Sequence, residues 1–460
     1  MDLFRTKKIF SEPDTLHRCL SATDLTLMGI GVIIGAGVFV LTGIAAATKA
    51  GPAVVFSYFI AGLASLFAAL SYAELAASIG GTGSAYNYTY VGFGEFIAWM
   101  IGWNLIFEYA FSVATVAIGW SGYVNDALIS FHIHLPALFL KNPFEGGIIN
   151  LPAVLIIFLL GILLCFGVRQ SARFNFFMVV IKLITIGLFV SVAAQHINMA
   201  NWKNFLPFGW HGVMQGSALV FFAYIGFDAL STAAEETINP QRNLPIGIIL
   251  SVLICSIIYI IVSGLLTAIT SYTTLNVKSP VSHALLTIGF PRIAGMIAVG
   301  AIAGLTTVML VMYYGLTRIT LAIARDGLLP RQFAKIHPRT KTPIFLIVLC
   351  GCIIATIAGL LPLEDAAELV NIGTLSAFTL VCAGVAVIRW NNPDLPRPFK
   401  LPWNPLIPVM GIIFCLYLML NLPAITWLRF VIWIFLGFII YFSYSYWHSL
   451  LGRVKSSFDC

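Results

Sequence analysis

An apolar run from Asp24 to Thr48 is long enough to cross a bilayer, yet glycines interrupt it. Five fall within it: Gly29, Gly31, Gly35, Gly37 and Gly43. Each glycine inside a helix costs about 1 kcal/mol relative to alanine, and lipid cannot hydrogen-bond the backbone groups that an unwound turn releases. The segment from Gly31 to Gly37 lies roughly 10–20 Å into the span at about 1.5 Å per residue. We therefore expect a helix that breaks near the middle of a membrane, where secondary transporters bind their solutes.

Composition also indicates a membrane protein. Of the 460 residues, 60% are hydrophobic and 9% are charged, whereas a soluble domain carries about 25% charged residues. Apolar runs of about 18–25 residues predict about twelve transmembrane helices. These begin near Asp24, Pro52, Phe93, Leu151, Phe174, Gly212, Pro245, Arg292, Pro343, Ala366, Leu406 and Trp427. The predicted fold is an all-α polytopic membrane protein with a single transmembrane domain over residues 1–460.

The basic residues predict the orientation of the chain in its membrane. If the N-terminus is inside, most of the excess positive charge lies in cytoplasmic segments, including the cluster Arg325, Arg331, Lys335, Arg339 and Lys341. By the positive-inside rule both termini are expected in the cytoplasm. The net charge of +7 is then explained by the orientation of the chain in a lipid bilayer, and no nucleic-acid partner is expected. Such clusters are expected to anchor helix ends, with a lipid or partner site as the alternative.

A second interrupted helix is expected in the sixth span. The segment from Phe221 to Ala229 places Gly226 and Asp228 roughly 20 Å into that span at about 1.5 Å per residue. Transporters often pair two broken helices at matching positions of inverted repeats. The halves would be residues 1–194 with helices 1–5 and 212–389 with helices 6–10, followed by helices 11–12 in 406–449. Free N–H groups at one break attract a carboxylate and free C=O groups attract an ammonium, so the two breaks predict a zwitterion site.

Several ionisable residues lie inside predicted spans, where charge is costly and marks a polar pathway. Burial favours the neutral amine of Lys182, which makes it a candidate to release and regain a proton; the alternative is a permanently charged lysine paired with helix carbonyls. Glu108 is either a second protonatable group or an interhelical hydrogen-bond partner. For Glu74 a structural role is favoured. Asp228 follows the expected break, and capping of the second half-helix is favoured there.

Other classes of protein fit less well. The Gly31 and Gly35 pair also suits close helix packing, which does not explain the remaining glycines. A channel needs a continuous polar pore, for which this chain has too few intramembrane polar residues. An enzyme needs a nucleophile–base or metal constellation, and the sequence offers none, so neither catalysis, a cofactor nor a metal is expected. A receptor would be expected to carry a larger ligand or effector domain than these short loops.

These motifs carry a family resemblance. Four segments, Gly29–Gly43, Phe221–Ala229, Ala234–Pro240 and Ala324–Pro330, resemble the amino acid–polyamine–organocation superfamily. Within it the chain most resembles the bacterial cationic amino acid transporter family. The resemblance covers nearly the whole chain and implies a five-plus-five inverted repeat of the leucine-transporter type, with discontinuous helices 1 and 6 and alternating access.

The resemblance also implies a substrate site. The substrate carboxylate is expected at the first break, at Ile33, Gly35, Ala36 and Gly37. The ammonium is expected at carbonyls of the second break, at Phe222, Ala223 and Ile225. Two single residues complete the implied set: Phe227 resembles the aromatic gate over the substrate, and Lys182 matches the fifth-helix lysine that replaces a sodium ion in proton-coupled relatives. Proton symport follows from that match, with Lys182 as carrier and Glu108 as a second candidate.

The substrate side chain is less constrained. A cationic side chain needs a carboxylate or an open polar pocket, whereas the eighth span offers Met309, Val311 and Met312. By the resemblance, Met312 matches a pocket position at which a smaller residue would leave room for a long side chain. We therefore expect small or neutral L-amino acids, with arginine or lysine uptake, or amino acid exchange, as the alternative. Packing is the competing role for these methionines.

Overall fold

The computed structural model describes residues 5–6, 20–79, 84–130, 132–166, 172–338, 340 and 342–452. Over this part the chain is helical, and its only bridge of β type joins Leu20 and Thr237. The longer helices are α1 (Ala22–Ile33), α3 (Val54–Ile79), α5 (Glu95–Ser130), α6 (Leu151–Cys165), α7 (Ala172–Ala193), α8 (Gly209–Val220), α9 (Pro240–Ile269), α11 (Pro291–Arg325), α12 (Ile344–Leu360), α13 (Leu363–Asn391), α14 (Leu406–Leu420) and α15 (Ala424–Ile440). The shorter α-helices are α2 (Thr42–Ala45), α4 (Ser84–Gly92), α10 (Pro280–Thr287) and α16 (Tyr446–His448).

Short 3₁₀ or π turns continue or connect these helices. Those that bear on function are η1 (Gly37–Leu41), η2 (Ala46–Ala50), η7 (Phe221–Tyr224) and η8 (Phe227–Glu236). The others are η3 (Gly51–Ala53), η4 (Ala137–Phe139), η5 (Pro143–Glu145), η6 (Met199–Trp202), η9 (Tyr272–Thr274), η10 (Arg331–Ala334) and η11 (Tyr441–Ser445).

The first helix has a defined start. The Ser21 hydroxyl accepts a hydrogen bond from the Asp24 backbone N–H at 3.3 Å, and the Asp24 carboxylate accepts one from the Ser21 N–H at 3.0 Å. This reciprocal capping box satisfies two of the N–H groups that a helix start leaves unpaired. It begins α1 two residues before the predicted start at Asp24.

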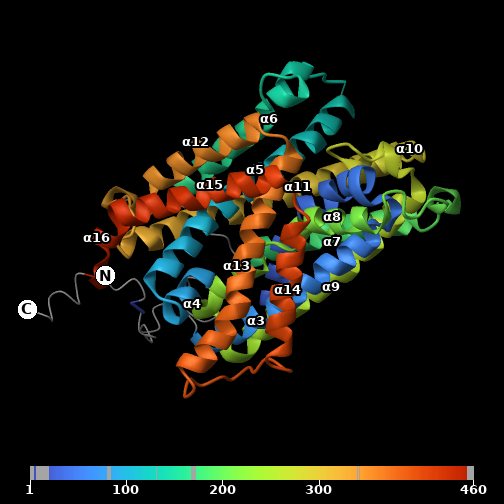
Figure 1. Cartoon of the computed structure of the whole chain (residues 1–460). Coiled ribbons are helices and arrows are strands. Elements are labelled where there is room, and N and C mark those ends of the chain that lie inside the picture. Colours follow the sequence, from blue (N-terminus) through green and yellow to red (C-terminus); the bar gives the residue numbers. More distant parts are fainter. Residues whose placement is uncertain are drawn as a thin grey trace, which may run out of the picture.

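The long helices pack in pairs around a continuous apolar core (Figure 1). α3 packs along α9, α5 along α11, and α6 along α12, while α1 lies between α7 and α9. α13 contacts α5 and α14. In Figure 1 α6 and α12 run side by side, and α13 and α14 cross the bundle as a neighbouring pair. The twelve predicted starts each fall within a few residues of the beginning of a helix.

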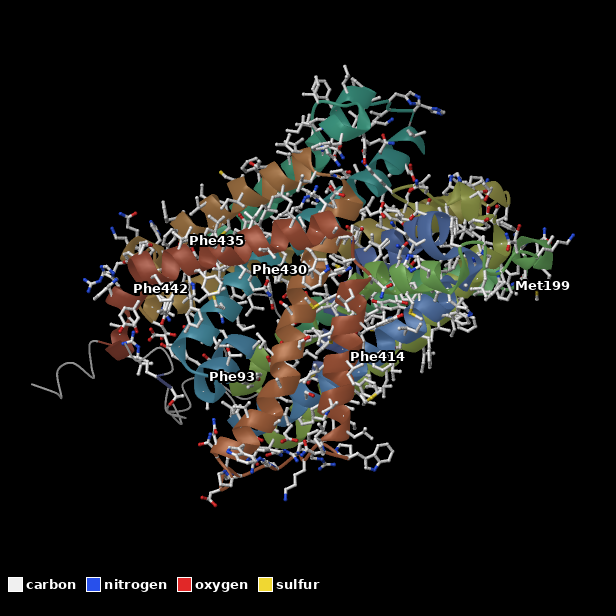
Figure 2. All side chains as sticks on the ribbon, in the orientation of Figure 1. Phe93, Met199, Phe414, Phe430, Phe435 and Phe442 are labelled. Atoms are coloured by element: carbon white, nitrogen blue, oxygen red, sulfur yellow. The ribbon has the colours of Figure 1, made fainter. Side chains whose placement is uncertain are left out.

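Much of the helical surface is apolar. Among the residues that the structure describes, seven helical stretches are long and apolar enough to cross a membrane, by length and composition. The first of them, Ala22–Ile79, contains α1 through α3. Four shorter apolar helices, α6, α12, α14 and most of α7, accompany them. Figure 2 shows Phe435 and Phe442 on α15 and η11, and their side chains are 61% and 45% exposed. An apolar exterior of this extent suits lipid and not water, so the predicted all-α membrane class is confirmed.

Glu74 has the structural role that the sequence favoured. It is buried in α3, and its carboxylate accepts hydrogen bonds from Arg389 Nε at 2.8 Å and Nη2 at 2.6 Å. The Leu401 N–H donates to the same carboxylate at 2.7 Å. This bidentate pair fastens α3 to the end of α13 and to the segment that leads to α14. Of the basic cluster discussed above, Arg339 and Lys341 lie outside the described residues.

Candidate functional site

Both predicted helix breaks are present. α1 ends at Ile33, Ile34 has an extended backbone with ψ of 100°, and a π turn begins at Gly37. α8 ends at Val220 and is followed by the 3₁₀ turn η7. Ile225 is then extended, with ψ of 140°, before η8 begins. Each break therefore lies inside an apolar stretch, where its backbone groups need partners from the protein.

The two breaks touch each other at a glycine. A Cβ atom on Gly37 would lie 2.3 Å from Ala223 Cα, so only glycine permits this approach of the two backbones. Gly226 has a φ of +113°, a region that side-chain-bearing residues avoid, and a Cβ there would lie 2.5 Å from Val32 Cγ1. These two glycines hold the second break against the first.

Side chains from neighbouring helices satisfy the carbonyl groups around the breaks. Lys182 Nζ on α7 donates to Gly31 O at 2.5 Å. The Tyr259 hydroxyl on α9 lies within hydrogen-bond distance of carbonyl oxygens of both breaks, 2.8 Å from Ile33 O and 2.9 Å from Ala223 O. The Tyr58 hydroxyl donates to Gly37 O at 2.9 Å. Three helices that were not predicted to break thus fix the shape of the two that do.

A small cavity lies where the breaks meet. It is lined by Val32, Ile33, Gly35, Ala36, Gly37, Ser112, Val116, Phe222, Ile225, Val308 and Met312. Its volume is about 10 Å³, roughly the minimum that holds one water. All the predicted substrate-binding residues except Ala223 and Phe227 line it. In this closed arrangement a solute enters only after the surrounding helices move.

Ala223 and Phe227 lie beside the cavity and do not line it. The Ala223 carbonyl faces the Tyr259 hydroxyl, as described above. The Phe227 ring is fully buried between two other rings, at 5.6 Å from Tyr72 and 4.9 Å from Phe378 between centroids. Phe227 therefore belongs to an aromatic layer that joins the second break to α3 and α13.

Lys182 is buried between α1 and α11. Its side chain is 1% exposed, and in the described part of the chain no carboxylate lies within ion-pair distance of it. Gly304 on α11 makes room for it, since a Cβ on Gly304 would lie 3.0 Å from Lys182 Cε. The ammonium thus reaches the end of α1 through a gap that a larger residue would fill.

Glu108 and Asp228 lie in the same buried region, between α5 and η8. Neither carboxyl oxygen of Glu108 has a hydrogen-bond partner among the described residues, and the side chain is 1% exposed. The Tyr109 hydroxyl donates to Asp228 Oδ2 at 3.3 Å. Glu108 and Lys182, the two proton-carrier candidates, form no ion pair with each other.

Sequence reasoning missed two polar groups at this site. Tyr259 bridges both breaks, but a tyrosine in an apolar span gives no sign of which helix it faces. The Ser112 hydroxyl lines the cavity, is buried and has no partner in the described part of the chain. Its position four residues after Glu108, on the same helix face, was an available signal. Both groups add hydrogen-bonding capacity to a site otherwise made of backbone and apolar side chains.

Known proteins resemble this chain over nearly its full length. Residues 20–443 match the family model described as amino acid permease. The chain is 47% identical over 458 residues to the methylthioribose transporter of Bacillus subtilis, covering 98% of this chain and 99% of that protein. It is also 47% identical to the branched-chain amino acid permease BcaP of the same organism, over 98% and 99% of the two chains.

A more distant relative has the family name that the motifs suggested. The vacuolar cationic amino acid transporter 4 of Arabidopsis thaliana is 38% identical over 393 residues, which cover 83% of this chain and 65% of that protein. The family match and the coverage agree with the two broken helices and the apolar exterior. The chain is an integral membrane protein that belongs to the amino acid permease family, within the amino acid–polyamine–organocation superfamily.

Proposed function

We propose that this permease carries neutral L-amino acids across the membrane by alternating access, with the substrate bound between the two helix breaks. The observation that carries the proposal is the cavity lined by both breaks at once. Backbone N–H groups of Gly35, Ala36 and Gly37 receive the substrate carboxylate. Carbonyl groups of Phe222, Ala223 and Ile225 receive its ammonium, and a carbonyl that already accepts from Tyr259 retains a second lone pair.

The helix pairing supports an inverted repeat. If helices 1–5 and 6–10 form two related halves, then α3 corresponds to α9, α5 to α11 and α6 to α12. These are the pairs that pack along each other. The two broken helices also occupy matching places and meet at Gly37 and Ala223. In this proposal twelve helices span the cell membrane, with α14 and α15 as helices 11 and 12 and both termini in the cytoplasm.

Lys182 is proposed to couple transport to protons. Its ammonium donates a hydrogen bond to Gly31 O, two residues before the end of α1. Among the described residues no carboxylate lies within ion-pair distance of it. A charged amine stabilises the end of α1 through this hydrogen bond, and loss of its proton weakens the contact. Protonation is then linked to the position of α1 and hence to the shape of the substrate site.

Glu108 is the second candidate for proton transfer. Burial of an ionised carboxylate without hydrogen-bond donors is costly, so the environment of Glu108 favours the protonated carboxyl group. It lies four residues before Ser112, which lines the cavity. A role in transport requires that motion of α5 or η8 exposes Glu108 to water.

The cavity lining favours neutral side chains. Beside the two breaks, Val116, Val308 and Met312 add apolar side chains to it, and none of its lining residues in the described part of the chain has a carboxylate to pair with a cationic side chain. One 47% identical relative is named for branched-chain amino acids and another for methylthioribose. A neutral amino acid can place its carboxylate at the first break and its ammonium at the second, whereas methylthioribose has neither group. Arginine or lysine remains the alternative among amino acids.

Uptake by the purified protein in liposomes tests this proposal. Radiolabelled L-alanine, L-leucine, L-arginine and methylthioribose are compared with and without an inward proton gradient, and protein-free liposomes are the control. We expect accumulation of alanine or leucine that requires the gradient. Preference for methylthioribose would overturn the substrate assignment, and exchange that ignores the gradient would overturn proton symport and leave an exchanger. Counterflow of label against unlabelled solute distinguishes a carrier from a receptor or a channel.

A further inference from the structure

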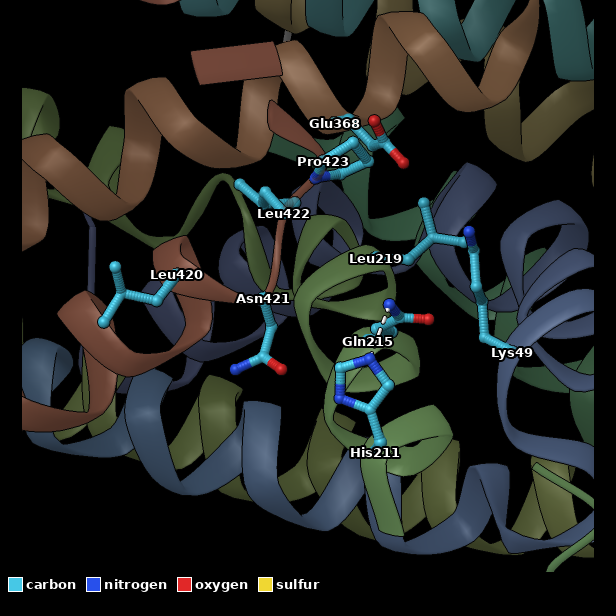
Figure 3. A pocket seen from close by; sticks show the side chains of 9 residues that line it. All are labelled: Lys49, His211, Gln215, Leu219, Glu368, Leu420, Asn421, Leu422 and Pro423. Atoms are coloured by element: carbon cyan, nitrogen blue, oxygen red, sulfur yellow. Dashed lines mark hydrogen bonds between the residues drawn. The ribbon is translucent and has the colours of Figure 1, made fainter. Parts of the chain in front are cut away.

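A second, larger cavity lies along α8, beside His211, Gln215 and Leu219, and it shares no lining residue with the central cavity. Its volume is about 210 Å³. Figure 3 shows the side chains around it, which come from η2, α8, α13, the end of α14 and the connection between α14 and α15. Its polar residues are Lys49, His211, Gln215, Glu368 and Asn421. Unlike the central cavity, it combines side chains of both charges.

Glu368 supplies the negative charge of this cavity. Its side chain is 5% exposed, and Thr426 Oγ1 donates to its Oε2 atom at 2.8 Å. Over the residues that the structure describes, no basic side chain lies within ion-pair distance of it. A buried carboxylate with one neutral donor has lost more hydration than that bond replaces. A cationic group in the cavity would supply the missing partner.

Lys49 supplies the positive charge from another side of the cavity. Its Nζ atom lies 3.4 Å from Glu364 Oε1, and about 25% of its side chain is exposed. An ammonium has three N–H donors, so the pair with Glu364 leaves donors for a ligand. His211 and Gln215 of α8 also line the cavity, and their side-chain nitrogen atoms are 3.1 Å apart (Figure 3). The cavity therefore offers a cation site, an anion site and neutral polar groups together.

A small zwitterion fits this combination. A simple anion would face the carboxylate of Glu368, and a simple cation would leave the free N–H donors of Lys49 without an acceptor. A volume of 210 Å³, against about 10 Å³ for the central cavity, holds many waters and leaves room for a small amino acid. We propose that this cavity is a second amino acid site, in which Glu368 binds the ammonium and Lys49 the carboxylate.

The second site adjoins the break in the sixth predicted span. Asn371, one turn after Glu368 on α13, donates to Ala218 O at 2.7 Å and to Leu219 O at 2.9 Å. Leu219 lines the second cavity, and α8 ends one residue later. An amino acid held there lies against the last turn of α8, on the other side of which the central site begins. This site needs neither Lys182 nor proton coupling, and it therefore goes beyond the function proposed above.

Binding stoichiometry tests the second site. Purified protein in detergent is dialysed to equilibrium against radiolabelled L-leucine and, separately, L-alanine. Glu368→Gln keeps an acceptor for Thr426 but removes the charge. Asp365→Asn is the matched control, because Asp365 lies three residues earlier on α13, pairs with Arg429 at 3.0 Å and does not line the cavity. Lys49→Gln changes the opposite side of the cavity from a different helix.

We expect two bound equivalents of one of these amino acids in the wild type and in Asp365→Asn, and one in Glu368→Gln and in Lys49→Gln. One equivalent in the wild type, or two in both cavity variants, would overturn the proposal. If Glu368→Gln does not fold, Lys49→Gln decides between the same two results. A single equivalent in the wild type that persists in both cavity variants leaves the central site in place, whereas no binding of either amino acid contradicts both sites.

Discussion

Lys182 Nζ donates to Gly31 O at 2.5 Å, which joins the middle of α7 to the last turn of α1 just before the first helix break. This contact connects a protonatable group to the backbone that is proposed to bind substrate. It depends on space provided by α11, because Gly304 lies directly against the lysine side chain.

Filling that space should disturb coupling more than folding. Gly304→Leu places a side chain where Lys182 Cγ and Cε now lie, 3.1 and 3.0 Å from a Cβ at position 304. We expect accumulation driven by a proton gradient to fall at least about tenfold, the equivalent of about 1.4 kcal/mol. Gly295→Leu is the control on the same helix, since a Cβ there meets nothing within 4 Å. Equal loss in both variants would show that the effect is not specific to Lys182.

Shortening Met312 should widen substrate choice. Its side chain lines the central cavity and approaches Gly226, with Cε 3.4 Å from a Cβ built there. Met312→Ala enlarges the cavity, so we expect the uptake ratio of leucine or arginine to alanine to rise several-fold. Met309→Ala serves as the comparison, because Met309 is buried on the same helix but does not line the cavity. An unchanged ratio in Met312→Ala would remove Met312 from the substrate site.

Removing the Tyr259 hydroxyl should affect both breaks together. Tyr259→Phe removes the one O–H that Ile33 O and Ala223 O share, and a buried group left unsatisfied costs about 1–3 kcal/mol. We expect the substrate concentration for half-maximal uptake to rise. Tyr313→Phe is the control: it removes a comparable bond, to Ile347 O, away from the breaks. It should lower the melting temperature without changing that concentration, and the same kinetic change in both variants would count against a positioning role for Tyr259.

Two ion pairs should differ in their contribution to stability. Arg389→Ala leaves the Glu74 carboxylate, which is 2% exposed, without its bidentate partner. Removal of one member of a fully buried pair costs about 3–5 kcal/mol, and we expect somewhat less here because Arg389 is 25% exposed. The pair of Arg429 with Asp365 is 37% and 34% exposed, so Asp365→Asn should cost about 0–1 kcal/mol. Thermal unfolding in detergent compares them. Similar melting temperatures for the two variants would contradict the structural role assigned to Glu74.

The sequence predicted the fold class and the two breaks because both follow from local chemistry. Apolar runs of bilayer length and clustered glycines are visible without knowledge of neighbours. The position of the first break was less certain, because α1 continues through Gly29 and Gly31 and stops at Ile33. Gly29 serves packing instead, since a Cβ there would lie 2.6 Å from Ser251 Cβ on α9. A glycine weakens a helix, but tertiary contacts determine at which turn the helix ends.

Side-chain partners could not be predicted in the same way. Tyr259 lies in a 30-residue helix, and only the packing of α9 against α1 brings its hydroxyl to both breaks. The second cavity depends on Lys49 and Glu368, which are far apart in sequence and meet through the arrangement of η2 and α13. The sequence did not predict that Glu74 pairs with Arg389, because only the packing of α3 against α13 brings the two residues together. Local patterns therefore located the breaks, whereas the groups that surround them required the structure.

Proton-driven uptake by Lys182→Ala, compared with Glu108→Gln, tests the central claim most directly. Wild-type protein and both variants are placed in liposomes, and accumulation of radiolabelled L-leucine and L-alanine is measured with and without an inward proton gradient. We predict that Lys182→Ala loses gradient-driven accumulation but still exchanges label against internal amino acid, while Glu108→Gln keeps a gradient response. Gradient-driven accumulation that persists in Lys182→Ala would contradict the account and move the proton pathway away from Lys182.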